Sequence, residues 1–147
     1  MLNRMVANFY ERDIRKLIEE VCLFKNEEDL WRTHGSVRNP AGNLALHIIG
    51  GLSYLIGATL AQTGYVRNRD LEFTRKDVER KELVAGLEKL IMLIKDTVNA
   101  LTREQMEAEY PLIFDGMKTS VSYVLVQLLA HLNYHLGLVN YLRRIFE

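Results

Sequence analysis

The spacing of apolar residues is the feature of this sequence that most restricts its fold. Over four long stretches, apolar side chains recur at intervals of three and four residues, and almost nowhere do they alternate with a period of two. That spacing places them along one face of an α-helix. We therefore predict four helices, over residues 2–24, 40–64, 81–101 and 119–146.

The number and length of these helices predict an all-α protein built as a four-helix bundle. The chain has 147 residues, which is long enough for a single domain, 1–147, with its own core. The connections 25–40 and 64–80 are long enough to cross the bundle, so a simple up-and-down order is not required. Proline and glycine in 109–120 predict an ordered loop or a brief extended pair there.

The second helix carries clear start and stop signals. Asn39 is a good N-cap, Pro40 suits the first helical position, and Gly64 suits the C-cap. Gly50 and Gly51 lie inside this helix, where glycine lowers helix propensity. They either permit a neighbouring helix or ligand to approach closely or are simply tolerated.

Charge and composition exclude several classes of protein. Lys plus Arg and Asp plus Glu both number 19, so the net charge is zero and the basic footprint of a nucleic-acid binder is missing. Charges near the N-terminus argue against a secretory signal, and we expect no apolar run of the roughly 20 residues that span a membrane. The single cysteine, Cys22, is expected to be buried. These features predict a cytoplasmic protein with no nucleic-acid or membrane partner.

Three of the four histidines fall on predicted core-facing stripes. The stripe of the last helix contains two of them, four residues apart: Val121, Val124, Leu128, His131, His135, Leu138 and Leu142. The stripe of the second helix contains a third: Leu44, His47, Gly51, Leu55 and Ala58. The fourth, His34, lies in a polar stretch and is predicted to be a solvated loop residue.

Histidines at this spacing are suited to binding a metal ion. Imidazoles at positions i and i+4, here His131 and His135, can converge on one ion, and His47 from a facing helix would complete three ligands. The alternative is that each buried ring only hydrogen-bonds a neighbour. Burying three imidazoles without a shared partner is costly, which favours the metal. Leu132 follows His131, so the glutamate of a zincin-type HExxH protease is missing.

Residues 64–73 form a second segment with potential function. Arg69 could hold an anionic group of a substrate at the mouth of a metal cavity, or the segment could be a salt-bridged loop that caps the helices. Tyr54 and Tyr134 could donate a proton near the histidines, although both also suit ordinary positions in the core or at its rim.

Three stretches resemble the DinB-like superfamily, in particular its small members with an NRD-EF type of loop. They are NPAGNLALHIIGGL, GYVRNRDLEF and LLAHLNYHLGLVNYLRR. The resemblance implies an up-down-down-up bundle, a homodimer, and a divalent metal, commonly zinc or nickel, bound by His47, His131 and His135. Characterised relatives include transferases and isomerases that use a low-molecular-weight thiol, others are hydrolase-like, and many have no known activity.

These observations define three hypotheses for function. In the first, the protein is a metal-dependent enzyme, a thiol-dependent transferase or a hydrolase, whose metal acts as a Lewis acid. In the second, it is a non-catalytic bundle that binds a metal or another ligand. In the third, it is a structural dimer whose histidines only form hydrogen bonds. The sequence identifies neither the substrate nor a catalytic residue.

Overall fold

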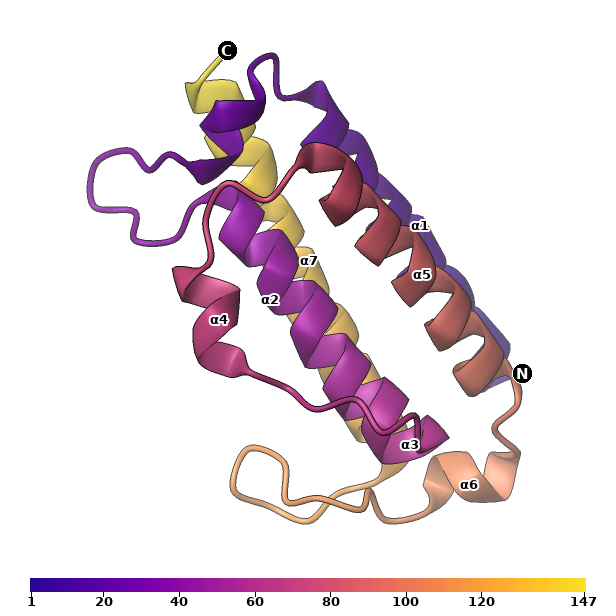
Figure 1. Ribbon diagram of the computed structural model, residues 1–147. Helices are drawn as coiled ribbons and strands as arrows, with labels where there is room; N and C mark the ends of the chain where they lie inside the picture. The colour runs from indigo at the N-terminus through magenta and orange to yellow at the C-terminus, as the bar shows by residue number, and fades with distance from the viewer.

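The computed structural model describes residues 1–147, and its regular elements are helical (Figure 1). The α-helices are α1 (Leu2–Leu23), α2 (Ala41–Leu52), α3 (Thr59–Ala61), α4 (Arg69–Thr74), α5 (Arg80–Asn99), α6 (Arg103–Glu107) and α7 (Val121–Ile145). A 3-10 turn covers Glu27–Trp31, and a π-helical segment, Ser53–Ala58, joins α2 to α3. The predicted all-α four-helix bundle is confirmed.

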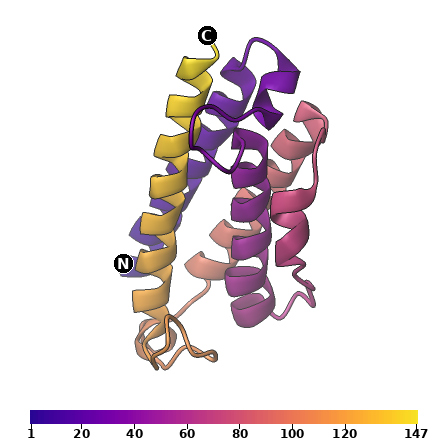
Figure 2. The same ribbon diagram turned by 90° about the vertical axis from the view of Figure 1, so that its left-hand side faces the viewer.

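The four long helices run up, down, down and up along the chain (Figure 1). In the bundle, α1 lies beside α5 and α7, and α2 also lies beside α5 and α7. Because α2 and α5 run in the same direction, residues 62–79 must return along the length of the bundle. This connection carries α4 along the outer side of α2 (Figure 2).

One continuous apolar core joins the long helices. Their largest fully buried apolar side chains include Ile14, Leu17, Ile56, Leu87, Ile94, Leu125 and Leu132. The buried Tyr10 hydroxyl donates a hydrogen bond to the backbone carbonyl of Leu125, so its polar atom is satisfied inside the core. The intervals of three and four seen in the sequence are therefore the core-facing positions of real helices.

The ends of the second helix differ from the prediction. Pro40 is the N-cap and Asn39 lies outside the helix, without a capping hydrogen bond. The helix ends at Ala61 because Gln62 adopts the left-handed conformation with φ of 53°. Gly64 also has a positive φ, of 79°, but it lies two residues beyond that cap and belongs to the turn into the crossover.

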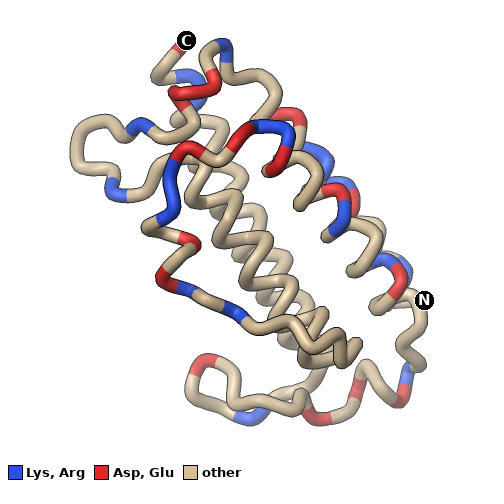
Figure 3. The backbone as a smooth tube through the Cα atoms, in the orientation of Figure 1, with Lys and Arg blue, Asp and Glu red and all other residues tan.

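Two further expectations are wrong. Cys22 is exposed, because consecutive helical positions point about 100° apart and its neighbour Val21 takes the core-facing position. The continuous helix Ala41–Ala61 is long and apolar enough to cross a membrane, whereas we expected no apolar stretch of that length. Half of its most apolar stretch is buried inside the protein, and the helix carries none of the charged side chains that line α1 and α5 (Figure 3).

The loop between α6 and α7 is an ordered extended pair, one of the two forms expected for residues 109–120. Isolated antiparallel bridges join Glu109 to Ser120 and Phe114 to Met117. The loop is attached to the π-helical segment that follows α2, because the Tyr110 hydroxyl donates to the carbonyl of Leu55. At its tip, Asp115 and Gly116 have φ of 49° and 76°, the positive values that a type I′ turn requires.

Candidate metal centre

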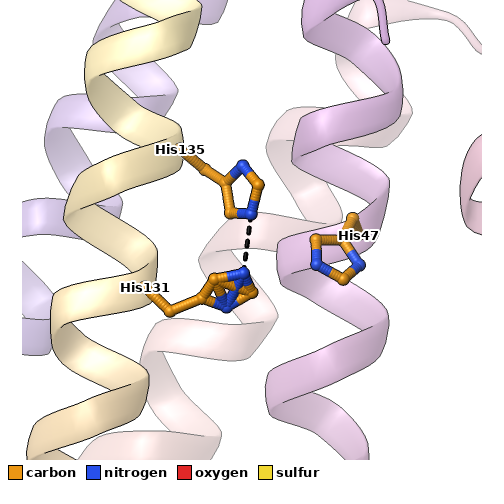
Figure 4. A group of neighbouring side chains, drawn as sticks. All are labelled: His47, His131 and His135. Atoms are coloured by element: carbon orange, nitrogen blue, oxygen red, sulfur yellow. Dashed lines mark hydrogen bonds between the residues drawn. The ribbon is translucent and has the colours of Figure 1, made fainter. Parts of the chain in front are cut away.

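Three histidines from two helices meet at one point in the structure (Figure 4). α2 contributes His47, and α7 contributes His131 and His135 one turn apart. One ring nitrogen from each histidine lies within 4.8 Å of the other two. The centroid of the His47 ring is 5.2 Å from that of His131 and 5.1 Å from that of His135. The structure therefore brings together the three residues that the sequence analysis selected.

The cluster lies at the edge of the core and not on its central stripe. His47 is buried, His135 is half-buried and His131 is exposed. On α7, Leu132 and Val139 face the core, whereas Leu138 is 39% exposed. The predicted stripe was wrong at His131 and Leu138, which lie one position from the true inward face, and correct at Leu142, which is buried. The histidines consequently face a solvent-accessible opening.

A buried carboxylate fixes the orientation of the His47 ring. The Nδ1 atom of His47 lies 2.9 Å from Oε1 of Glu72, which is 6% exposed. With the carboxylate accepting a hydrogen bond from Nδ1–H, the Nε2 atom of His47 is unprotonated and faces the α7 pair. A histidine that binds a metal through one ring nitrogen commonly donates a hydrogen bond from the other to a carboxylate, as His47 does here.

An arginine holds Glu72 in place, and glycines in α2 leave room for its side chain. Arg67 donates two hydrogen bonds to it, from Nε to Oε2 at 2.9 Å and from Nη2 to Oε1 at 3.0 Å. A Cβ atom on Gly50 would lie 2.0 Å from Oε2 of Glu72, and one on Gly51 would lie 3.3 Å from Arg67. Both glycines therefore permit a close approach, and Gly50 leaves the space that Glu72 occupies.

The position of Glu72 depends on how α4 is attached to α2. Asn68 caps α4 by accepting a hydrogen bond from the Leu71 N–H. The buried Asn43 side chain of α2 donates to the backbone carbonyls of Glu72 at 2.9 Å and Arg75 at 2.8 Å. The sequence left two interpretations open for residues 64–73. The segment contains an ion pair, as expected of a salt-bridged capping loop, and it also borders the histidine cluster.

Sequence reasoning placed Glu72 among the polar residues of this segment, but it missed Arg67 and did not predict the contact of Glu72 with His47. A buried glutamate in a polar loop has no distinctive spacing, and only the fold shows that it meets His47. Tyr54 lies in the π-helical segment Ser53–Ala58, and Tyr134 is 66% exposed with its ring centroid 5.4 Å from that of His135. His34 is exposed in its loop, as predicted.

The three rings are suited to bind a metal because they are neutral near pH 7. Burial lowers the pKa of His47, although the Glu72 carboxylate opposes that shift. Partial burial of the His131 ring also lowers its pKa, although the Asp115 carboxylate opposes that shift. Burial, together with the neighbouring His131 and His47, lowers the pKa of His135 to about 4. Neutral imidazole is the form that coordinates metals, so protons compete weakly for these nitrogens.

The spacing of the nitrogens also fits a shared ion. The Nε2 atoms of His131 and His135 are 2.7 Å apart. A tetrahedral ion with bonds of about 2.0–2.1 Å separates its nitrogen ligands by about 3.4 Å. That separation lies between the 2.7 Å that separates the His131 and His135 nitrogens and the 4.8 Å within which the nitrogens of all three histidines lie. Small side-chain rotations are therefore enough to seat one ion among three nitrogens.

The up-down-down-up bundle and its histidine cluster place the protein in the class of DinB-like helical proteins. The chain belongs to the DinB-like family described as "Protein of unknown function (DUF1572)", whose sequence model matches residues 1–147. The fold is similar to the crystal structure of a DinB-like protein from Bacillus cereus ATCC 10987, with a TM-score of 0.71 and 16% identity. That alignment covers 90% of this chain and 84% of the other. No curated protein matches the sequence.

Proposed function

We propose that the protein binds one divalent transition-metal ion, zinc or nickel, through His47, His131 and His135. The observation that carries this proposal is the convergence of three ring nitrogens within 4.8 Å, one of them oriented by the buried carboxylate of Glu72. Three histidine ligands leave further positions for water or substrate, which is typical of catalytic metal sites. No side chain other than these three histidines is needed as a protein ligand of the ion.

We further propose that the site is catalytic, in a thiol-dependent transferase or a hydrolase. A divalent ion in this place would supply Lewis-acid chemistry. The residues of the chain orient it: Glu72 holds His47, and Arg67 holds Glu72 in place. Cys22 lies on α1, away from the cavity-lining residues, so a thiol reactant would be an external small molecule.

Metal content tests the proposed site. Protein purified without a histidine tag and reconstituted with zinc is expected to hold about one ion per chain by elemental analysis. His131→Ala and His47→Ala should each lose the ion, because only two imidazole ligands remain in each variant. His34→Ala is the matched control, since it removes an exposed loop histidine and should keep the metal. Full metal content in both cluster variants would show that the site assignment is wrong.

Turnover separates the enzyme from the alternative, a non-catalytic metal-binding or ligand-binding bundle. The zinc-loaded and nickel-loaded proteins would be assayed with activated esters, and with small thiols plus an electrophile. Turnover that disappears in His131→Ala and persists in His34→Ala would support an enzyme. A loaded protein that turns over no member of these panels would favour the binding role.

We also propose that the protein is a cytoplasmic homodimer that pairs through the outer face of α7. An exposed apolar stripe runs along this helix: Tyr123, Val126, Tyr134, Leu138, Tyr141 and Ile145. No Lys, Arg, Asp or Glu occurs between Val121 and Leu142. Exposed apolar surface of this extent is typical of protein interfaces. Sedimentation equilibrium should show a dimer that Tyr134→Glu dissociates, whereas a monomeric parent protein would contradict the proposal.

A further inference from the structure

A cavity of about 240 Å³ opens beside the histidine cluster. His47 and His131 form part of its wall, and Leu52, Leu55 and Leu128 give it an apolar side. It is smaller than the roughly 300–1,000 Å³ of sites for drug-sized ligands, so it suits a small molecule. Its charged wall residues are Arg67, Arg69 and Asp115.

The two arginines of the cavity differ in what they contact. Arg67 forms an ion pair with Glu72, so the two charges cancel. Arg69 has no carboxylate partner and no side-chain hydrogen bond in the structure. Its guanidinium carbon lies 5.4 Å from the centre of the Phe73 ring, and that ring lies 4.8 Å from the ring of His47. Phe73 therefore lies near both the unpaired guanidinium of Arg69 and the ring of His47.

The balance of charge in the loaded cavity favours an anion. The three histidines are neutral ligands, and Glu72, the carboxylate that touches them, is neutralised by Arg67. Asp115, at the tip of the α6–α7 loop, offsets Arg69 but makes no ion pair or hydrogen bond with it. The charge of a divalent ion would thus remain uncompensated in a partly enclosed space, which is costly unless a ligand supplies negative charge.

We propose that this cavity binds a small carboxylate-bearing molecule, with the carboxylate on Arg69 and a second polar group directed at the histidine cluster. This inference rests on the proposed metal site. The planar guanidinium matches a carboxylate through two parallel hydrogen bonds. Asp115 also lines the cavity, and it would repel a phosphate dianion more strongly than a carboxylate monoanion.

A pair of matched ligands isolates the contribution of the carboxylate. 4-Methylimidazole and imidazole-4-acetate both offer a ring nitrogen to a metal ion, and only the second carries a carboxylate. Their binding to the cobalt-loaded protein would be followed by the visible absorption of the ion. We expect imidazole-4-acetate to bind at least about tenfold more tightly, as for a hydrogen-bonded charge pair.

Charge variants then test the assignment to Arg69. Arg69→Gln should remove the preference for imidazole-4-acetate and leave the binding of 4-methylimidazole unchanged, while Arg69→Lys should retain part of it. Asp115→Asn should increase the preference, because a repelling charge is removed. Lys118→Gln is the matched control, since this exposed cation lies in the same loop as Asp115 and does not line the cavity.

The outcomes distinguish this inference from the metal site on which it rests. Equal binding of the two ligands to the cobalt protein, or equal losses in Arg69→Gln and Lys118→Gln, would overturn the carboxylate subsite and leave the metal site standing. Failure of the parent protein to bind cobalt would contradict the metal site and, with it, this inference.

Discussion

At the scale of single residues, the most informative side chain is Glu72, whose contact with His47 the sequence did not predict. A buried glutamate is costly unless it is paired, and here it meets both Arg67 and His47. These contacts give it a positioning role, because it fixes which nitrogen of His47 faces the other two histidines.

Replacement of Glu72 by glutamine should therefore weaken metal binding without unfolding the protein. We expect Glu72→Gln to raise the dissociation constant for zinc by about 10–100-fold, the usual cost of losing the outer partner of a histidine ligand. Competition with a chromophoric chelator measures this change. Glu82→Gln is the control, because Glu82 pairs with Arg75 at an exposed site. An unchanged dissociation constant in Glu72→Gln would exclude the positioning role.

A second residue-scale prediction concerns Gly50. Gly50→Ala should displace Glu72, whose Oε2 lies 2.0 Å from the position of the new Cβ, and should lower zinc affinity in the same direction as Glu72→Gln. Gly137→Ala in α7 has no atom within 4 Å of the new Cβ and should raise the free energy of unfolding by about 0.5–1 kcal/mol. Chelator competition and urea unfolding measure the two effects, and unaltered affinity in Gly50→Ala would count against the packing argument.

At the scale of elements, α1 and α7 are joined by a polar contact beside the core. Glu20 accepts hydrogen bonds from Asn140 at 2.8 Å and from Nε of Arg143 at 2.6 Å. Burial raises the pKa of Glu20, but the hydrogen bonds from Arg143 and Asn140 outweigh it, and the net pKa is lowered from 4.5. The ionised form is therefore more stable in the folded protein than in the unfolded chain.

This contact should make stability depend on pH. Because the folded-state pKa of Glu20 is depressed, its stabilising contribution is complete above about pH 4.5 and is lost as pH falls through the lower, folded-state value. Glu20→Gln should thus be less stable than the parent protein at pH 7, and the difference should shrink below pH 4.5. Urea unfolding of both proteins across this range measures it, and a difference independent of pH would contradict the assignment.

The elements also show what the sequence could and could not predict. The four long helices and their approximate bounds followed from apolar spacing alone, because that spacing is set by the helix period. The π-helical segment Ser53–Ala58 was not foreseen. Within it, the Leu55 carbonyl accepts a hydrogen bond from Tyr110, a long-range contact that no local pattern encodes. The short helix α4 was read only as a loop, since six residues give too little periodicity to recognise.

At the scale of the whole molecule, the histidine cluster joins α2 to α7, so an ion bound there should stabilise the bundle. At a free zinc concentration one hundred times the dissociation constant, binding stabilises the folded state by about 2.7 kcal/mol. For a chain of this length we expect a rise in Tm of roughly 5–10 °C. Differential scanning calorimetry with zinc and with a chelator measures it. The rise should be absent in His131→Ala and present in His34→Ala, and no rise in the parent protein would contradict the link.

The residues of the site were predictable where their chemistry repeats at helical spacing. His131 and His135 stood out because they lie one turn apart, and His47 because it shares a stripe with core residues. Their exact exposure was not predictable, since one position of drift along α7 moves a side chain from the core to its edge. The contacts of Arg67 and Glu72 with each other and with His47 became visible only through the crossover, whose path along α2 depends on the order of the helices.

Zinc-edge anomalous diffraction from crystals of the zinc-loaded protein tests the central claim most directly. The account predicts one anomalous peak per chain, about 2.0–2.1 Å from a ring nitrogen of each of His47, His131 and His135. A peak elsewhere on the molecule, or no peak after reconstitution with zinc, would contradict it.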